Sequence, residues 1–366
     1  MSKKRILLIC NDSDTVINFR KELILFLQKN DYDVSVIVSD DRRNEDILKL
    51  NVLLKVVPFN NRSKNPFSYL SLKRHFAKEI RKINPDIVFT FQIKPNTAGV
   101  IASKKAGISN VFSMIEGLGD PFQPKSFKGK ILKIIVSHLY RKSLNITKKV
   151  FFLNEDDRRE FVENKIIPLD KCVLIPGIGI DTSKYMFKEE LSKNKRVLVL
   201  SRLLKNKGIF DCCEVAKKVK ETRPDIEFSF FGKEGDIKVS DLSEYIDSKI
   251  ITFNGYTKDA MKEIADCRIL LSCSYREGFP RIFLESMAIG RVVLSSDVIG
   301  SRAVIENGVT GYLVPVHDVS SFASKIIELI DDDSTLKKVA RQARTICENK
   351  YSSNSVNKLL LEEITK

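Results

Sequence analysis

Two glutamates eight positions apart are the residues of this chain whose types and spacing best fit ligand chemistry. Glu277 and Glu285 lie in the segment EGFPRIFLE, which follows residues 268–273, a short apolar run typical of a buried parallel strand. Pro280 suits the first turn of a helix and Gly290 suits its C-terminal cap, so we expect Glu277 on a loop and Glu285 inside the helix. Carboxylates beside the anion-binding start of a helix fit a ligand with phosphates and hydroxyls, such as a nucleotide-sugar. The spacing alone fits two solvated helix charges equally well.

Other candidate residues follow neighbouring strands of the same predicted sheet. Arg202 and Lys207 lie in a strand-to-helix loop after residues 196–200, the natural position for a diphosphate clamp, although basic loops are also common on plain surfaces. Gly232 ends another strand, where a glycine allows close approach of the backbone. The segment FNGY, which ends at Tyr256, follows a further strand and can supply backbone contacts to a nucleobase. Each signal is weak, and their convergence on one sheet edge carries the hypothesis.

Length and composition indicate a two-domain enzyme without disulfides. The 366 residues exceed the usual size of one core, and 43% apolar with 30% charged residues is ordinary for a soluble globular protein. The seven cysteines form no CxxC pair and fall mostly in apolar patterns, so we expect reduced thiols. The three histidines are scattered and predict no metal site. Neither a signal peptide nor a membrane-spanning segment is expected.

The positive charge is concentrated in one stretch. Residues 51–150 hold 19 Lys and Arg against 4 Asp and Glu, which accounts for the whole net charge of +15. Such a field indicates an anion-binding face. No nucleic-acid motif accompanies it, whereas residues 125–142, KSFKGKILKIIVSHLYRK, combine an apolar helical run with basic residues. We therefore expect contact with an anionic membrane and no nucleic-acid partner; a core helix with basic flanks is the alternative.

Short apolar runs alternate with helical patterns along the chain, which predicts an α/β protein with two parallel sheets. The expected strands of the first half are residues 5–10, 34–38, 52–57, 86–90, 110–112, 150–153 and 172–175, and those of the second half are 196–200, 227–231, 250–253, 269–273, 292–295 and 311–314. The expected helices are residues 19–29, 66–83, 97–106, 128–143, 155–164, 208–220, 258–266, 280–289, 320–329, 336–348 and 354–365, with another beginning near residue 301.

The domain boundaries follow from this rhythm. Residues 176–181, PGIGID, and the polar stretch 182–195 are typical of a hinge. We expect an N-terminal domain over 1–181 and a C-terminal domain over 182–353; the family resemblance given below implies that the first binds the acceptor and the second the nucleotide-sugar. Both should be Rossmann-like doubly wound domains that face each other across a cleft. The last segment, 354–366, should form a helix that can pack back on the N-terminal domain.

With these motifs in order, the chain resembles glycosyltransferase family 4, retaining enzymes of the GT-B fold. The resemblance covers residues 196–330 and is carried by SRLLKNKG, FFGKEGD, FNGYTKD and the block SYREGFPRIFLESMAIG. It implies that Glu277 contacts hydroxyls of the donor sugar, that Glu285 binds the ribose, and that Arg202 and Lys207 hold the diphosphate and stabilise the leaving group. The donor-binding set it implies consists of Gly278, Phe279, Pro280, Glu285, Gly232 and Tyr256.

The first half is similar to a narrower subgroup, bacterial transferases that extend polyprenyl-diphosphate-linked oligosaccharides. The motifs NFR at 18–20, FQIKPN at 91–96 and EGLGDPF at 116–122 carry this similarity. It implies that Asn18, Arg20, Lys94 and Glu116 meet the acceptor or the donor, although Arg20 and Lys94 also fit plain surface charges. The implied partners are a nucleotide-sugar, UDP-linked in preference to GDP-linked, and a lipid-linked saccharide. The implied location is peripheral, on the cytoplasmic face of the plasma membrane.

The mechanism implied is front-face transfer with retention, in which the leaving diphosphate oxygen takes the acceptor proton and no metal or other cofactor is needed. A metal-dependent GT-A enzyme would instead use an acidic pair such as Asp12 and Asp14 or the run 331–333. A GT-B sugar epimerase or phosphorylase is the alternative enzyme. A basic membrane or nucleic-acid binding module is the alternative without catalysis, and it predicts that Glu277 and Lys207 are dispensable.

Overall fold

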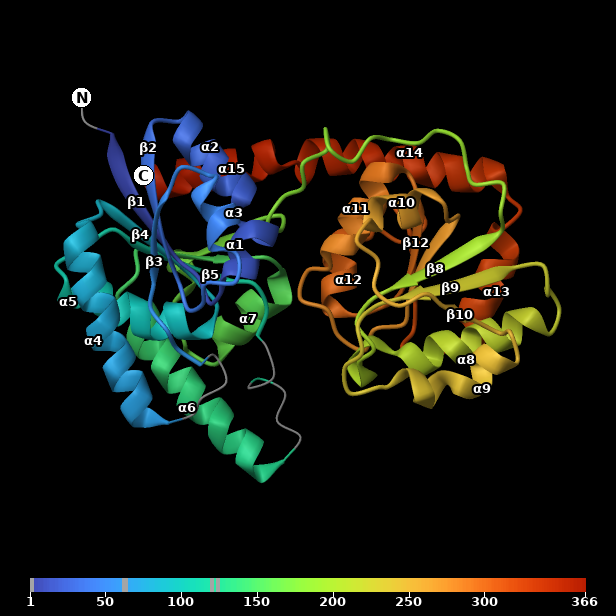
Figure 1. Cartoon of the computed structure of the whole chain (residues 1–366), viewed down its shortest axis with the longest axis horizontal. Coiled ribbons are helices and arrows are strands. Elements are labelled where there is room, and N and C mark those ends of the chain that lie inside the picture. Colours follow the sequence, from blue (N-terminus) through green and yellow to red (C-terminus); the bar gives the residue numbers. More distant parts are fainter. Residues whose placement is uncertain (1–2, 61–64, 119–121, 123–125) are drawn as a thin grey trace. The chain divides into compact units, whose positions relative to one another are not determined.

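The chain divides into two compact units, which are described separately below. The computed structural model describes residues 3–60, 65–118, 122 and 126–366. Unit 1 comprises Met1–Gly179 and Ser353–Lys366, and unit 2 comprises Ile180–Ser352 (Figure 1). The division falls close to the expected boundary at the hinge. The last helix belongs to unit 1.

Unit 1 is built on a seven-stranded, all-parallel sheet in the order β3-β2-β1-β4-β5-β6-β7. Its strands are near-continuous apolar runs, as expected when helices cover both faces. Every residue of β4 and β5 is buried. The strands are β1 (Lys4–Ile9), β2 (Tyr32–Val38), β3 (Leu53–Val56), β4 (Ile87–Phe91), β5 (Val111–Ile115), β6 (Lys149–Phe152) and β7 (Cys172–Leu174).

Two groups of helices flank this sheet (Figure 1). One group contains α1 (Ser13–Phe19), α2 (Lys21–Lys29), α3 (Asn44–Leu48) and α15 (Ser353–Thr365); the other contains α4 (Pro66–Ile83), the π-helix η1 (Pro95–Gly99), α5 (Val100–Lys105) and α6 (Phe127–Leu144). The helix α7 (Glu155–Glu163) contacts β6 and β7. Phe76 and Ile80 of α4 pack on Leu7 and Val88 of the sheet, which forms the core on that face.

Unit 2 repeats the plan with a six-stranded parallel sheet in the order β10-β9-β8-β11-β12-β13. Its strands are β8 (Arg196–Leu200), β9 (Glu227–Phe231), β10 (Thr252–Phe253), β11 (Ile269–Ser272), β12 (Val292–Ser296) and β13 (Tyr312–Val314). Its α-helices are α8 (Ile209–Lys220), α9 (Ser243–Asp247), α10 (Ala260–Ala265), α11 (Arg281–Ile289), α12 (Ile299–Val304), α13 (Val319–Leu329) and α14 (Asp333–Lys350).

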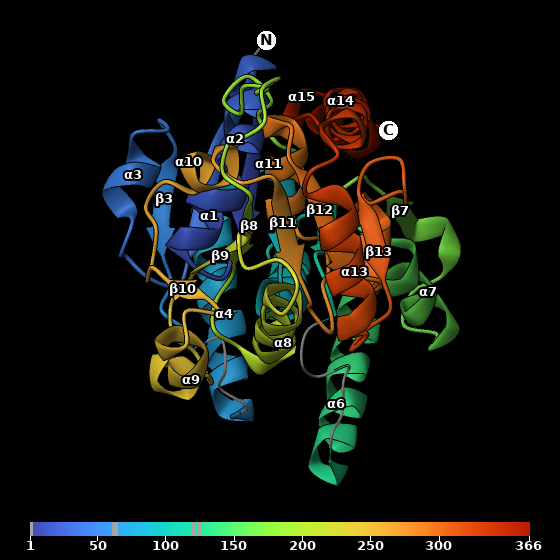
Figure 2. The ribbon, with the colours of Figure 1, turned by 90° about the vertical axis from the view of Figure 1, so that its right-hand side faces the viewer.

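Helices cover both faces of this second sheet (Figures 1 and 2). On one face α8 packs against α13, and residues such as Val215 and Ile326 close that core. On the other face α11 packs against α14, with Met287 and Ala343 in a second cluster. The two doubly wound sheets confirm the predicted α/β class.

Several expected elements differ in detail. The expected helix over 19–29 is two helices, because the chain bends at Arg20 and an unpredicted α1 precedes it. The helix expected from residue 97 begins as the π-helical turn η1, which starts at Pro95, and becomes α-helical only at Val100. The short helices α3 and α9 were not predicted, since neither is long enough to show a period.

Two further expectations concern cysteines and membrane spans. All seven cysteines are unpaired, and six of them are buried, which confirms the prediction of free thiols. Among the described residues, no helix combines the length and apolarity needed to cross a bilayer.

Candidate functional site

The predicted donor-site residues follow the C-terminal ends of adjacent strands in unit 2. Arg202 comes after β8, Gly232 after β9, Tyr256 after β10 and Glu277 after β11. Parallel strands end on the same edge of a sheet, and β8 and β11 are central neighbours. These residues therefore share the edge at which open α/β sheets bind ligands.

Lys207 and Glu277 form an ion pair at this edge. The Lys207 Nζ lies 2.6 Å from Oε1 and 2.8 Å from Oε2 of Glu277. The side chains are only 24% and 12% exposed, so water screens the two charges weakly. An ammonium has three N–H donors, and two of them serve Glu277, which leaves one for a ligand.

Two glycines allow the loops of this pair to approach each other. Gly208, at φ 63°, ends the short 3₁₀ turn Lys205–Lys207, and a Cβ there would lie 2.0 Å from the Cys273 carbonyl oxygen. Gly300 donates its N–H to the Glu277 carbonyl oxygen at 3.1 Å, and a Cβ there would lie 2.5 Å from that oxygen. A side chain at Gly208 would push the Lys207 turn away from the end of β11, and one at Gly300 would push α12 away from the Glu277 loop.

The second glutamate lies in α11, is only 14% exposed, and is held by two partners. Tyr185 donates its phenolic O–H to Glu285 Oε1 at 2.9 Å, and Arg281 Nε lies 3.1 Å from the same oxygen. Burial raises the pKa of the Glu285 carboxyl. Burial, followed by the nearby Glu285 charge, also raises the pKa of Tyr185 to about 12, so the phenol keeps its proton at neutral pH. Tyr185 was missed in the sequence because it lies in the hinge, 100 residues from its partner.

The remaining predicted donor residues have varied positions. Pro280 is the N-cap of α11 and lies outside the first turn where it was expected, because its ψ of 102° is extended. The Phe279 ring lies 6.0 Å from that of Tyr351. Arg202 is exposed, Gly278 lies in the loop before α11, and the Gly232 N–H donates to the Gly255 carbonyl oxygen at 2.8 Å. The 61%-exposed ring of Tyr256 lies 4.4 Å from Lys233 Nζ.

A hydrogen-bonded cluster of three side chains near this edge was not predicted from the sequence. Asp211, in the first turn of α8, accepts the Tyr275 phenolic O–H at 3.0 Å on Oδ1 and contacts His317 Nδ1 at 2.9 Å through Oδ2. The Tyr275 and His317 rings lie 4.5 Å apart. Single scattered polar residues gave no sequence signal for this group, which fixes Tyr275 two positions before Glu277.

In unit 1 the structure brings Arg20 and Glu116 together and shows that Arg20 is not the plain surface charge that the sequence also allowed. The two side chains form an ion pair, but Arg20 is only 1% exposed and offers no surface to a ligand. Glu116 follows β5 and its side chain is 22% exposed. Gln92, which sequence reasoning overlooked, donates from Nε2 to the second carboxylate oxygen.

The other expected acceptor-side residues lie on separate segments. Lys94 Nζ donates to the Asn60 carbonyl oxygen at 2.5 Å, and partial burial lowers the pKa of its ammonium. Asn18 is exposed near the end of α1. Within the motif EGLGDPF, residues 119–121 lie outside the described residues, whereas Phe122 is buried against Phe161.

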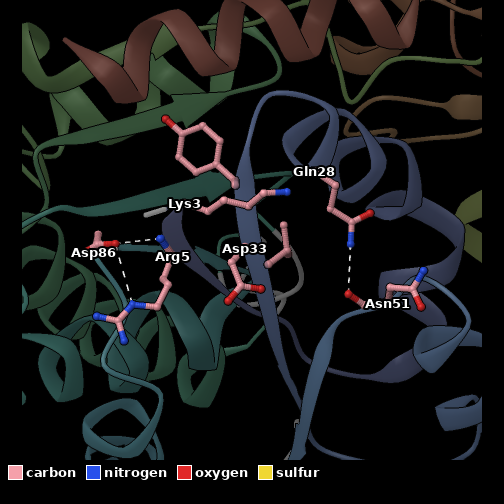
Figure 3. A pocket seen from close by; sticks show the side chains of 8 residues that line it. Lys3, Arg5, Gln28, Asp33, Asn51 and Asp86 are labelled. Atoms are coloured by element: carbon pink, nitrogen blue, oxygen red, sulfur yellow. Dashed lines mark hydrogen bonds and ion pairs between the residues drawn. The ribbon is translucent and has the colours of Figure 1, made fainter. Parts of the chain in front are cut away.

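One hollow of unit 1 lies away from these residues. It measures about 840 Å³ and is lined by Lys3, Arg5, Gln28, Asn51 and Asp86, among others (Figure 3). The Arg5 N–H donates to Asp86 Oδ2 at 2.7 Å. The hollow lies at the N-terminal ends of β1 and β2, opposite the edge where ligands are expected, and we assign it no role.

Comparison with known families decides the class. Residues 181–346 match the family model "Glycosyl transferases group 1", and residues 5–150 match "Glycosyl transferase 4-like". The chain is a group 1, family 4-like glycosyltransferase. This confirms the resemblance found in the sequence.

Relatives and solved structures agree with this assignment. The transferase is 27% identical over 342 residues to the N,N'-diacetylbacillosaminyl-diphospho-undecaprenol alpha-1,3-N-acetylgalactosaminyltransferase of Campylobacter jejuni, covering 90% of each chain. It is 24% identical to the UDP-Gal:alpha-D-GlcNAc-diphosphoundecaprenol alpha-1,3-galactosyltransferase of Escherichia coli, over 84% of this chain and 82% of that one.

Among solved structures, Anabaena HepE in complex with UDP and glucose matches 99% of both chains at a TM-score of 0.81 and 18% identity. A glycosyltransferase from Rickettsia africae matches 100% of both at 0.79 and 24%. These likenesses establish the GT-B fold.

Proposed function

We propose that this glycosyltransferase moves a hexose or N-acetylhexosamine from a UDP-sugar to a polyprenyl-diphosphate-linked saccharide, with retention at the anomeric carbon. One observation carries the proposal: Lys207, Glu277 and Glu285 lie within one unit, around the loop and helix that follow β11. An ammonium for the diphosphate and two carboxylates for hydroxyl groups are the chemistry that a nucleotide-sugar needs.

The transfer step places its largest charge on the leaving diphosphate. The bond from the anomeric carbon to the phosphate oxygen breaks, the bond to the acceptor oxygen forms on the same face, and the acceptor proton passes to the leaving oxygen. The third N–H of Lys207 and the exposed Arg202 guanidinium are the groups that stabilise this developing charge. Glu277 holds the sugar hydroxyls and Glu285 holds the ribose. Because the two cations supply the stabilisation, the proposed step needs no metal or other cofactor.

The names of the relatives support the donor and acceptor proposed for this chain. The Campylobacter jejuni and Escherichia coli enzymes are both named for diphospho-undecaprenol-linked acceptors, and the second is named for UDP-Gal. The comparisons give no support to a sugar epimerase. We therefore favour transfer in the synthesis of bacterial surface polysaccharide or glycan.

The acceptor's lipid indicates a membrane partner, and α6 in unit 1 has the surface for it. Phe127, Ile134 and Ile135 are 78%, 69% and 51% exposed. A hollow of about 630 Å³ runs along the helix and is lined by these two isoleucines together with Lys130, Lys133, His138 and Arg141, among others. Figures 1 and 2 show the N-terminal half of α6 projecting from its unit. The predicted segment begins at residue 125, which lies outside the described residues.

Exposed apolar side chains interleaved with basic ones suit an anionic leaflet, at about 1 kcal/mol per basic residue near the surface. On α4, Phe67 is 80% exposed and adds a further apolar contact. We therefore propose that the enzyme is cytoplasmic and peripheral, bound to the inner face of the plasma membrane.

The function is tested by a screen of nucleotide-sugars against lipid-linked acceptors, with products sized by mass spectrometry. Lys207→Ala and Glu277→Gln should each lower transfer by about 100-fold or more, because each removes charge or hydrogen bonding at the reacting centre. Lys205→Ala is the matched control, since Lys205 lies in the same turn but is exposed. Unchanged transfer in both variants, or turnover of the nucleotide-sugar without any acceptor, refutes the proposal. Chelation with EDTA should leave the rate unchanged.

The membrane proposal is tested separately with liposomes. Binding should require anionic lipid and weaken with salt, and Ile134→Glu with Ile135→Glu should abolish it. Leu169→Glu is the control, because Leu169 is 57% exposed in unit 1 but lies outside α6. Binding that ignores salt, or that survives the double substitution, refutes the assigned surface.

A further inference from the structure

A buried arginine stands behind the carboxylate of Glu116 in unit 1. Arg20 occupies the bend between α1 and α2: its N–H bonds to the Val16 carbonyl oxygen, and its own carbonyl oxygen accepts from Ile24, both at 2.9 Å. The bend turns the side chain inward, where the guanidinium pairs with Glu116 and lies 4.1 Å from the centre of the Phe91 ring. A full positive charge is thereby placed beneath the carboxylate.

A second side chain holds the other oxygen of the same carboxylate. Gln92 follows β4 and donates from Nε2 to Glu116 Oε2, while its own Oε1 accepts the Asn11 N–H at 3.2 Å. Asn11 follows β1 and Glu116 follows β5, and these strands flank β4 in the sheet. Gln92 therefore ties three neighbouring loops together. Its φ of 66° is unfavourable for a residue other than glycine and persists only where the surroundings impose it.

The two side chains of the Arg20–Glu116 pair differ in solvent exposure. The Arg20 side chain is 2% exposed, whereas that of Glu116 is 22% exposed. A buried ion pair adds little net stability compared with apolar packing, so stability alone gives little reason for a charge at this position. A carboxylate accepts about four hydrogen bonds, and Arg20 and Gln92 supply two of them. Among the described residues no other group bonds to this carboxylate, so its remaining acceptor positions lie on the exposed side.

We infer that Arg20 and Gln92 are positioning residues that hold the Glu116 carboxylate to accept a hydrogen bond from a sugar hydroxyl of the acceptor, without touching the substrate themselves. This inference rests on the proposed function and replaces the direct ligand role expected for Arg20 from the sequence. Burial lowers the pKa of Arg20 to about 10, which still leaves the guanidinium charged at neutral pH.

The test compares kcat and KM of the full chain with its lipid-linked acceptor in three variants: Glu116→Gln, Arg20→Met and the double substitution. Each single substitution should lower kcat/KM for the acceptor by about 10- to 100-fold, the value of one hydrogen bond to a charged group. Because Arg20 acts only through Glu116, the double variant should be no worse than Glu116→Gln alone. Arg20→Lys should recover part of the loss, and UDP affinity should stay within about twofold throughout.

The pH profile separates orientation from mere stability. Removing the guanidinium withdraws a charge that favours the ionised carboxylate, so the acid limb of kcat/KM should move to higher pH in Arg20→Met. The Cys10 thiol also faces Arg20, but burial raises its pKa to about 12, so it does not titrate in this range. Arg291→Lys is the structural control, since Arg291 is 2% exposed and binds main-chain carbonyl oxygens in unit 2, such as those of Lys188 and Ala265. It should lower the Tm and leave the kinetics of folded enzyme unchanged.

Two results overturn the inference. Additive losses in the double variant would show that Arg20 contacts the substrate directly. Kinetics within twofold of wild type in Arg20→Met, with only the Tm lowered, would show that Arg20 is structural, and Arg20→Gln decides the point if Arg20→Met does not fold. A wild-type enzyme that transfers no sugar to any lipid-linked acceptor refutes the proposed function as well, whereas active wild type with unaltered variants refutes this inference alone.

Discussion

Removing one hydroxyl from the hinge should weaken nucleotide binding. Tyr185 is 6% exposed and donates to Glu285 Oε1 at 2.9 Å, so Tyr185→Phe deletes this hydrogen bond and keeps the buried ring. Hydrogen bonds to charged groups contribute about 1.5–3 kcal/mol. Because Arg281 Nε remains 3.1 Å from the same oxygen, we expect the lower end of that range. About 1.5 kcal/mol corresponds to a roughly tenfold rise in the Kd for UDP.

Isothermal titration of the full chain with UDP measures this change, and thermal unfolding measures its structural cost. A loss of about 1–2 kcal/mol should lower the Tm of a unit of this size by roughly 2–8 °C. Tyr312→Phe is the matched control, because Tyr312 begins β13, an edge strand of the sheet in the same unit, and does not contact Glu285 in the described structure. It should leave the Kd unchanged.

The pH dependence gives an independent check. The phenolic O–H favours the ionised carboxylate, so its removal should raise the pKa of Glu285 further above its ordinary value. As pH falls, UDP binding by the variant should therefore weaken at a higher pH than binding by wild type. A Kd within twofold of wild type, with only the Tm lowered, would refute the idea that Tyr185 orients the carboxylate proposed to bind the ribose.

Three further substitutions test other parts of the donor site. Gly208→Ala should destabilise unit 2 by several kcal/mol in denaturant unfolding, because its Cβ would lie 2.0 Å from the Cys273 carbonyl oxygen. Gly255→Ala is the control: it has φ 70° but open space around it, so it should cost about 1 kcal/mol. Burial raises the pKa of Glu285 in the folded chain, so this carboxyl stabilises the fold at low pH and that contribution is lost as pH rises through its folded-state pKa. Glu285→Gln should therefore gain stability over wild type as pH rises while UDP binding weakens, and a pH-independent difference in Tm would contradict this. Lys207→Arg should lower kcat by about tenfold or more, since a planar guanidinium does not reproduce a compact ammonium held between two carboxylate oxygens; unaltered kcat would show that charge alone matters.

The sequence predicts the two sheets well for a physical reason. Strands covered by helices on both faces must be apolar almost throughout. Runs such as IVFTF in β4 and RVLVL in β8 can therefore be recognised as strands from the sequence. The bend at Arg20 was not predicted, because an amphipathic pattern continues across it and a charged residue is expected to be exposed. Burial of an arginine depends on a partner from a distant strand, which no local pattern reveals.

The positions of the candidate-site residues were also predictable from the sequence, whereas their partners were not. The loops that carry Arg202, Lys207 and Glu277 follow from strand ends and could be placed from the sequence. The pairing of Lys207 with Glu277 joins residues 70 positions apart, and that of Tyr185 with Glu285 joins residues 100 positions apart. Sequence patterns give the type and edge of such residues, but their partners depend on how the loops pack.

Two carboxylates of the candidate sites, Glu277 and Glu116, differ in the cation that neutralises them, and this difference has a chemical reason. Glu277 is paired with a lysine that is 24% exposed, a flexible cation that keeps one donor for a phosphate. Glu116 is backed by an arginine that is 2% exposed and fixed by the bend between two helices, so its counter-charge stays in place. A diphosphate that carries its own negative charge needs a cation that can respond to it, whereas a neutral sugar hydroxyl needs only a carboxylate of fixed orientation. The choice of lysine in one unit and buried arginine in the other therefore matches a charged ligand at the first position and a neutral one at the second.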